Sequence, residues 1–245
     1  MTAAPGSPAV EIRGLEVRYG EILALHDAHL AVAPGRVCGL VGMNGAGKTS
    51  LLRSVLGLTR PVSGVVLVDG APPAAARRAG TVAYVPQSED VDWDFPLCVL
   101  DVVSTGRYAH QGPLRRARPA DREAVASALA RVGLAGLSDR QIGALSGGQR
   151  KRAFVARAIA QDARLLLLDE PFAGVDTATQ EDLTTLLREL AASGATVLVS
   201  THDLESVPAL CDEVALVAGT VVDHGPPGRL LEAASLARAF GRAVA

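Results

Sequence analysis

Residues 42–49 read GMNGAGKT and have the spacing of a phosphate-binding loop, in which a lysine and a hydroxyl residue follow the last glycine. Glycines let backbone N–H groups converge on phosphate oxygens without clashes from Cβ atoms. The Lys48 ammonium can reach the β- and γ-phosphates of a nucleotide, and the Thr49 hydroxyl can ligate Mg²⁺. The segment predicts a nucleotide site made by Gly42, Met43, Asn44, Gly45, Ala46, Gly47, Lys48, Thr49 and Ser50.

Lysine is rare in this chain, because Lys48 and Lys151 are the only lysines among 24 basic residues. A compact ammonium fits between phosphate oxygens where the planar guanidinium of arginine would not. The presence of lysine at position 48 therefore supports a phosphate-binding role. Lys151 lies on a predicted helix, and we expect its side chain to face solvent.

Two carboxylates, Asp169 and Glu170, directly follow the buried strand predicted at residues 164–168, whose last four residues are leucine. Ligands of parallel sheets bind at the carboxyl ends of the strands. We therefore expect Asp169 to hold a metal ion and Glu170 to polarise an attacking water molecule.

The predicted elements alternate between buried apolar strands and helices, which favours a mostly parallel sheet covered on both faces. A strand at residues 36–41 runs into the phosphate loop, and a helix at residues 50–58 follows it. The other predicted strands are residues 10–19, 30–32, 65–68, 81–85, 164–168, 196–200 and a hairpin of 214–217 with 220–222. The other predicted helices are residues 99–106, 121–132, 149–160, 180–193 and about the last 20 residues.

The composition is that of a globular chain with 245 residues, of which 49% are hydrophobic and 20% are charged. The 24 basic and 26 acidic residues nearly balance, which argues against a nucleic-acid partner. The three cysteines are far apart, so the spacing predicts neither a zinc site nor a disulfide framework. No apolar run approaches the length of a membrane helix, so we expect a soluble chain whose role at a membrane depends on a partner.

Residues 145–149 read LSGGQ, which resembles the signature of ATP-binding cassette (ABC) ATPases. Further family marks appear in order at Tyr19, Gln87, residues 174–176 and His202. The resemblance implies an α/β fold, with a P-loop NTPase (RecA-like) core, a mostly parallel sheet, an antiparallel N-terminal β part and an inserted helical subdomain. It implies one ABC ATPase domain at residues 10–230 with the helical subdomain at about 88–157, preceded by a flexible N-terminus (1–9) and followed by a C-terminal helix (231–245).

The resemblance also assigns roles to the marks. Tyr19 stacks on adenine, a role that we prefer to that of a core aromatic. The implied catalytic residues are Glu170, His202 and Gln87. The implied Mg²⁺ ligands are Thr49, Gln87 and Asp169. Met43 stands where the family usually has proline, and Thr49-Ser50 reverses the common order; both departures are compatible with phosphate binding by backbone and hydroxyl groups.

The signature residues precede the helix predicted at residues 149–160, and they form a second anion site at a helix N-terminus. In the family, two chains dimerise head to tail, so that the signature of one chain caps the γ-phosphate held by the other. The resemblance thus implies a homodimer and adds four nucleotide contacts, Ser146, Gly147, Gly148 and Gln149.

The stretch from Gln87 to Arg107 resembles the ATPases of manganese, zinc and iron importers. In that group this surface receives a cytoplasmic helix of the membrane subunit, and Trp93 suits such a socket; a place in the core of the helical lobe is the alternative for Trp93. The resemblance implies membrane-spanning permease subunits, an extracytoplasmic substrate-binding protein and a peripheral location at the cytoplasmic face of the cell membrane.

Alternative functions remain open at the level of sequence. The transporter could import siderophores or other small solutes, or export its substrate. A soluble non-transport ABC ATPase is disfavoured, because the chain has neither a long coiled-coil insertion nor a second cassette. A nucleotide-gated regulatory module without turnover is disfavoured by the presence of Glu170 and His202.

Overall fold

The computed structural model describes residues 7–87, 96–112 and 116–241. The N-terminal part of the chain forms a three-stranded antiparallel sheet, as expected. Its strands, in spatial order, are β2 (Ile22–Val32), β1 (Val10–Tyr19) and β4 (Ser63–Val68). β2 is longer than the predicted strand at residues 30–32. Its outer half pairs with β1 while exposing Ile22 and Leu23, so its side chains there show no buried apolar pattern.

A six-stranded sheet forms the core, and its first five strands are parallel. Only the edge strand β9 (Val221–Gly225) runs antiparallel, in the predicted hairpin with β8 (Glu213–Val217), and the chain turns at Gly219. The strands in spatial order are β5 (Val82–Val85), β6 (Leu165–Asp169), β7 (Thr196–Thr201), β3 (Val37–Val41), β8 (Glu213–Val217) and β9 (Val221–Gly225).

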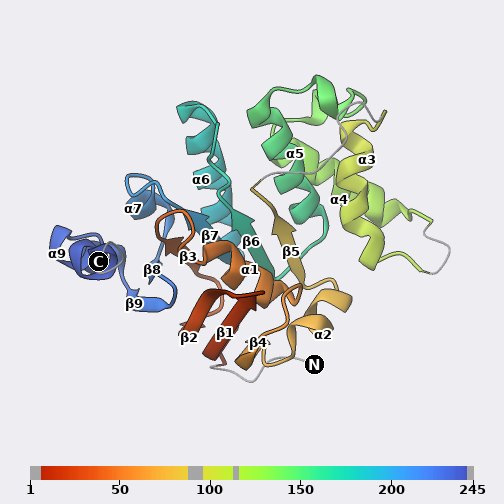
Figure 1. Cartoon of the computed structure of the whole chain (residues 1–245). Coiled ribbons are helices and arrows are strands. Elements are labelled where there is room, and N and C mark those ends of the chain that lie inside the picture. Colours follow the sequence, from red (N-terminus) through yellow and green to blue (C-terminus); the bar gives the residue numbers. More distant parts are fainter. Residues whose placement is uncertain (1–6, 88–95, 113–115, 242–245) are drawn as a thin grey trace.

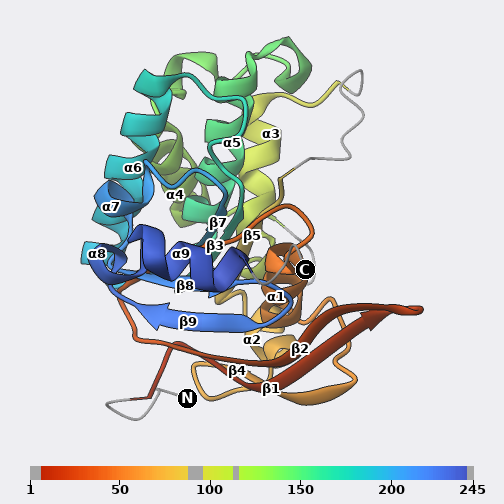
Figure 2. The ribbon, with the colours of Figure 1, turned by 60° about the vertical axis from the view of Figure 1, so that its left-hand side comes forward.

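Alternate residues of the core strands enter two different hydrophobic clusters, because successive side chains point to opposite faces of a sheet. On β6, Leu165 and Leu167 pack with helix α1 (Lys48–Leu56) and the antiparallel sheet. Leu166 and Leu168 pack on the other face, with helix α6 (Thr177–Ala192) and the helical lobe. Figures 1 and 2 show the antiparallel sheet as a separate layer beneath the core sheet.

A helical lobe is inserted between β5 and β6. Arg107 links the helices of the lobe, because the guanidinium of Arg107 donates hydrogen bonds to Asp121 Oδ1 at 3.0 Å and to the Ala160 carbonyl at 2.8 Å. The lobe confirms the inserted helical subdomain of the predicted fold class. Its helices are α3 (Val99–Ser104), η1 (Thr105–Ala109), α4 (Pro119–Arg131), η2 (Ala135–Leu137), η3 (Ile142–Ala144) and α5 (Gly147–Ala160).

The ends of the chain differ in part from the expectation. Ala9 is buried and bonds to Val32 and Asp69, so the flexible N-terminus predicted at residues 1–9 is already fixed at its last residue. No helix was expected at α2 (Pro73–Arg78), where a short run of alanines follows proline. The remaining helices are α2 (Pro73–Arg78), α7 (Val207–Leu210), α8 (Pro227–Leu230) and α9 (Ala233–Phe240).

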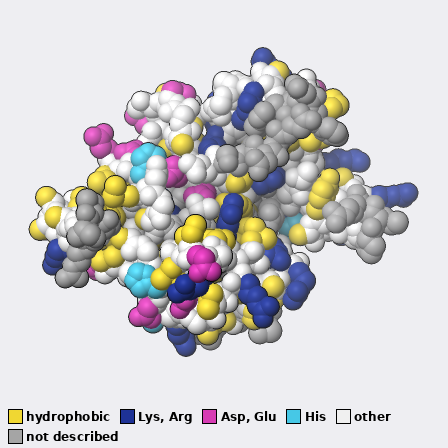
Figure 3. Space-filling view, in the orientation of Figure 1, with side chains coloured by type: hydrophobic (Ala, Val, Ile, Leu, Met, Phe, Trp, Pro, Cys, Tyr) yellow, Lys and Arg dark blue, Asp and Glu magenta, His cyan; other side chains and the backbone are white. Residues whose placement is uncertain are grey.

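The predicted C-terminal helix at residues 231–245 is shorter in the structure, where α9 starts at Ala233 and ends at Phe240. Within the described ranges, no helix combines the length and apolar character needed to cross a membrane. Basic and acidic side chains both appear on the face shown in Figure 3, in line with the nearly balanced charge.

Candidate active site

The phosphate loop joins β3 to α1, so it lies at the carboxyl end of the central strand of the core sheet. Two of its glycines sit where a side chain cannot fit. A Cβ at Gly42 would lie 2.3 Å from the Val217 carbonyl oxygen. A Cβ at Gly47, whose φ is 100°, would lie 2.6 Å from Leu25 Cδ2. The close packing explains why the loop requires glycine at both positions.

Lys48 is buried at the first turn of α1 and points back along the loop. Its Nζ donates hydrogen bonds to the carbonyls of Gly42, at 2.7 Å, and Met43, at 3.1 Å, and lies 3.7 Å from Glu170 Oε1. Burial lowers the pKa of Lys48, and the negative charges of Glu170 and Asp169 oppose that shift. Backbone carbonyls of the loop thus hold the ammonium next to the Glu170 carboxylate.

Asp169 ends β6 and is nearly inaccessible to solvent. Its Oδ1 accepts a hydrogen bond from Ser200 Oγ at 2.5 Å, and its Oδ2 accepts one from Tyr84 OH at 3.4 Å. The Ser200 hydroxyl also accepts a hydrogen bond from the Glu170 backbone N–H at 3.0 Å. Ser200 therefore fixes the carboxylate of Asp169 and the backbone of Glu170 together.

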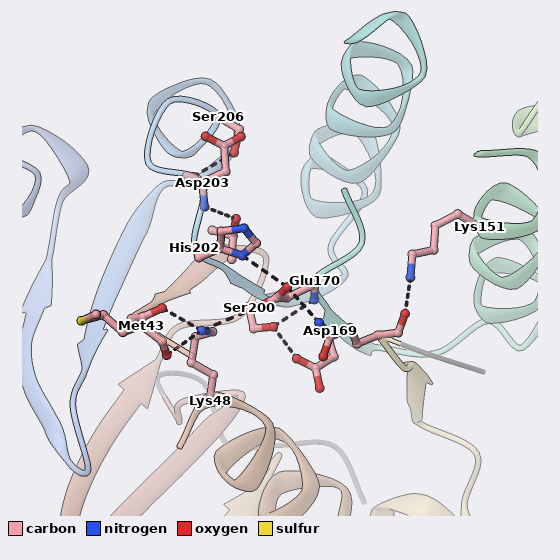
Figure 4. Close-up of polar contacts among 12 residues, drawn as sticks. Met43, Lys48, Lys151, Asp169, Glu170, Ser200, His202, Asp203 and Ser206 are labelled. Carbon is pink, nitrogen blue, oxygen red and sulfur yellow. Dashed lines mark hydrogen bonds and ion pairs between the residues drawn. The ribbon is translucent and has the colours of Figure 1, made fainter. Parts of the chain in front are cut away.

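Glu170 is the centre of the polar contacts at this edge of the sheet (Figure 4). Its Oε2 accepts a hydrogen bond from Gln87 Nε2 at 3.0 Å and lies 3.2 Å from His202 Nδ1. Gln87, Glu170 and His202 follow the adjacent strands β5, β6 and β7. The parallel order of these strands thus brings together three side chains that are far apart in the sequence.

A pocket of about 430 Å³ opens beside the loop. Its wall combines the phosphate loop, the end of β1 and the start of β2. Tyr19, predicted to stack on adenine, is 43% exposed here, and its hydroxyl is 3.2 Å from Thr59 Oγ1. The lining residues are Tyr19, Ile22, Leu23, Ala24, Met43, Asn44, Gly45, Ala46, Gly47, Lys48, Thr49, Ser50, Gln87 and Glu170.

The signature residues lie in the helical lobe and do not line this pocket. Ser146 caps α5: its hydroxyl accepts a hydrogen bond from Gln149 N at 3.2 Å, and Gln149 Oε1 accepts one from Ser146 N at 3.0 Å. Ser146 and Gly147 are exposed, and Gly148 and Gln149 follow them on the same helix end. One chain therefore presents two separate helix N-termini with exposed polar groups.

The expectation for Lys151 is wrong, because its side chain does not simply face solvent. Its Nζ donates hydrogen bonds to the carbonyls of Gln87, at 3.0 Å, and Pro86, at 3.4 Å (Figure 4). These bonds connect the signature helix α5 to the segment of the same chain that contains Gln87. Sequence reasoning missed this role and that of Ser200, since both depend on contacts between segments distant in the chain.

Part of the predicted permease surface lies outside the described residues, because Trp93 and its neighbours fall within positions 88–95. The described part of that stretch includes α3, whose residues Val99 and Val103 are buried in the helical lobe, while Leu100 is exposed.

Comparison with known proteins decides the family. Residues 25–173 match the model of the ABC transporter family. The chain belongs to this family. As an ABC transporter ATP-binding subunit, it binds and hydrolyses ATP.

Two curated relatives of this ABC subunit are similar over almost its whole length. The manganese transport system ATP-binding protein MntA of Synechocystis is 43% identical, over 95% of this chain and 90% of its own. The chelated iron transport system membrane protein YfeB of Yersinia pestis is 47% identical, over 96% of this chain and 79% of its own.

A solved structure described as an inward-facing metal-chelate type ABC transporter also matches this ABC subunit, with 29% identity and a TM-score of 0.83. The match covers 96% of this chain and 89% of that one. The ABC subunit CbiO1 of Clostridium perfringens, part of the CbiONQ complex, gives a TM-score of 0.79 at 29% identity, over 96% and 95% of the two chains. Both comparisons confirm the predicted fold class.

Proposed function

We propose that this chain is the energy-coupling ATPase of an importer for manganese, zinc or iron. The observation that carries the catalytic part is the position of Glu170, whose carboxylate borders the pocket and is contacted by Gln87, Lys48 and His202. A buried carboxylate held in this way can accept a hydrogen bond, and then a proton, from a water molecule placed at the γ-phosphate. Glu170 is therefore the proposed general base.

His202 and Lys48 are the proposed stabilisers of negative charge. The loop N–H groups and the Lys48 ammonium face the phosphates, where charge develops on the transferred group. His202 and Lys48 both contact the Glu170 carboxylate, and the His202 side chain is 59% exposed (Figure 4). An exposed imidazole at that place can reach a phosphate oxygen without first breaking a buried contact.

The residues near Asp169 fit Mg²⁺, because they offer the oxygen ligands that this ion prefers. Asp169, Thr49 and Gln87 are the proposed ligands, directly or through water. When bound, the ion would neutralise phosphate charge. Ser200 and Tyr84 orient the Asp169 carboxylate, so this ligand is held in place before the nucleotide arrives.

We propose that the complete site forms between two copies of the chain. The exposed helix end at Ser146, Gly147, Gly148 and Gln149 is an anion-binding group that the pocket of its own chain does not use. A head-to-tail homodimer would place it over the γ-phosphate held by the partner, and would thereby close both sites at one two-fold interface.

The transported metal is proposed from the relatives, which are manganese and chelated iron transport proteins; a zinc transport system ATP-binding protein, TroB of Treponema pallidum, is 41% identical over 95% of this chain. The proposed partners are permease subunits, which bind around Gln87 to Arg107, and a substrate-binding protein outside the membrane. The chain would act at the cytoplasmic face, as one ATPase domain at residues 10–230.

Uptake measurements test this function in cells that lack the gene. The wild-type gene should restore uptake of at least one of Mn²⁺, Zn²⁺ and Fe²⁺, whereas Lys48→Ala and Glu170→Gln should not. Glu189→Gln, which changes an exposed carboxylate on α6, is the matched control and should restore uptake fully. Unchanged uptake of all three metals in the deletion strain would contradict the metal assignment, and full rescue by Glu170→Gln would contradict the catalytic one.

A further inference from the structure

Three potential metal ligands meet at the end of the core sheet that lies away from the phosphate loop. Cys38 on β3 and Glu213 on β8 are direct partners in the parallel ladder. His224 on β9 pairs with Ala215, two residues along β8 from Glu213. One ligand atom from each of the three side chains lies within 4.8 Å of the other two.

The cluster could not be predicted from the sequence, because its residues come from three segments and no pair has a metal-ligand spacing. The cysteine spacing predicts no zinc site, and His224 does not cluster in the sequence with another histidine or a cysteine. The hairpin of β8 and β9 and the parallel pairing of β3 with β8 create the cluster. Cys211, the other buried cysteine, packs in the opposite hydrophobic cluster of the core sheet.

Two polar atoms of the cluster are buried without a hydrogen-bond partner among the described residues, namely Glu213 Oε1 and His224 Nε2. His224 Nε2 lies 3.2 Å from Glu213 Oε2, so the imidazole and the carboxylate already face each other. Leaving buried polar atoms unpaired costs free energy, and such atoms in a folded protein call for a partner. A cation between the side chains would supply one to both.

The donor set indicates which cation. A thiolate, an imidazole and a carboxylate form a mixed soft and hard set that suits Zn²⁺ and neighbouring transition metals, whereas Mg²⁺ and Ca²⁺ prefer oxygen alone. A divalent cation would offset the repulsion between the thiolate and the carboxylate.

We propose that Cys38, Glu213 and His224 form a binding site for Zn²⁺ or a chemically similar transition-metal ion, with water completing a four-coordinate shell. Cys38 precedes Gly42 by four residues on an extended strand, so the site is about 13 Å from the phosphate loop and distinct from the Mg²⁺ position. The proposal does not depend on which substrate the transporter carries.

The ion would join three adjacent strands, two of which lead to the nucleotide site. β3 continues into Gly42, and the carbonyl of Val217, at the end of β8, packs against the same glycine. Binding to the folded state alone raises its stability. We therefore expect Zn²⁺ to raise the Tm of the metal-stripped chain.

Titration of the full, untagged, chelator-treated chain with Zn²⁺ and with Co²⁺ tests the site. We expect one ion per chain and, with Co²⁺, the charge-transfer absorption of a cobalt–thiolate bond. Cys38→Ser should abolish that absorption, and His224→Gln should weaken Zn²⁺ binding at least tenfold and remove the Tm rise. Cys211→Ser and His29→Gln are matched controls that should bind as the wild type does.

The proposal is overturned if the Co²⁺ complex of the wild type lacks thiolate absorption, or if Cys211→Ser removes it while Cys38→Ser does not. It is also overturned if His224→Gln leaves the Zn²⁺ affinity and the Tm rise unchanged. Because His224 lies in an edge strand and is only partly buried, this second variant decides the matter even if Cys38→Ser fails to fold.

Discussion

The hydroxyl of Ser200 contacts both acidic residues of the proposed site. It donates to Asp169 Oδ1 and accepts from the Glu170 backbone N–H. Hydrogen bonds to charged groups contribute more to stability than neutral ones, and a carboxylate oxygen left buried without its donor is costly. Ser200 should therefore influence both stability and the binding of Mg²⁺.

Ser200→Ala is expected to lower the free energy of unfolding by about 2 kcal/mol, because it removes the donor to a buried carboxylate. It should also raise the Mg²⁺ concentration needed for half-maximal ATP hydrolysis, since Asp169 loses its orientation. Urea unfolding and a Mg²⁺ titration of phosphate release measure these effects. Ser193→Ala, which removes a hydroxyl bonded to Leu190 O, is the control. Equal Mg²⁺ dependence in the two variants would contradict the role of Ser200.

At the scale of elements, the start of α5 connects the signature to the segment after β5 that contains Gln87. Ser146 caps the helix, and one turn later Lys151 bonds to the carbonyls of Gln87 and Pro86. A movement of α5 would therefore be transmitted to the backbone of Gln87. The same glutamine contacts Glu170, which links the signature helix to the proposed base.

Lys151→Met should leave ATP binding unchanged but reduce kcat for phosphate release about tenfold, which corresponds to one charged hydrogen bond of about 1.4 kcal/mol. The reason is that Gln87 loses its backbone support while the phosphate loop stays intact. Lys151→Arg should recover part of the rate, because it keeps a cationic donor. A kcat equal to that of the wild type, with an unchanged KM, would show that this link plays no part in turnover.

Within the helical lobe, Asp121 begins α4 and joins it to the rest of the lobe. Its carboxylate accepts hydrogen bonds from the Arg118 backbone N–H and from the Arg107 guanidinium. The Arg118 N–H and then the Arg107 side chain hold the pKa of Asp121 below its ordinary value of 3.8. The ionised form is therefore the one that stabilises the lobe.

Since the pKa of Asp121 is lower in the folded state, its contribution to stability is complete above about pH 4 and disappears as the pH falls through the folded pKa. Asp121→Asn should lower the urea midpoint at pH 7, and the gap to the wild type should narrow at pH 3. Asp139→Asn, at an exposed position of the same lobe, should show no gap at either pH. A gap for Asp121→Asn that widens on acidification would contradict this assignment.

The sequence could predict those parts of the site that are local. The phosphate loop, the pair Asp169-Glu170 and His202 each follow an apolar strand directly, so their place at one edge of a parallel sheet could be inferred. Ser200 and Lys151 act on partners about 30 and 64 residues away, and the sequence carries no periodic signal for such contacts. The outer half of β2 could not be predicted for a related reason, since it forms by backbone pairing with β1 and has no buried apolar face.

At the scale of the whole molecule, the separation of the two helix N-termini has a direct consequence. The phosphate loop joins β3 to α1 at the carboxyl end of the core sheet, whereas the signature begins α5 in the helical lobe (Figure 1). Each is a proposed anion site, and the residues that line the pocket beside the loop do not include the signature. The central claim is that ATP brings the two together across a pair of chains.

The molar mass of Glu170→Gln in solution tests this claim most directly, because the variant should bind ATP without consuming it. With Mg-ATP, light scattering should show a mass twice the 25.2 kDa of the chain, and without nucleotide it should show 25.2 kDa. Adding Ser146→Arg to Glu170→Gln should keep the chain at 25.2 kDa while the phosphate loop still binds ATP. A Glu170→Gln chain that is saturated with Mg-ATP and remains a monomer would contradict the account.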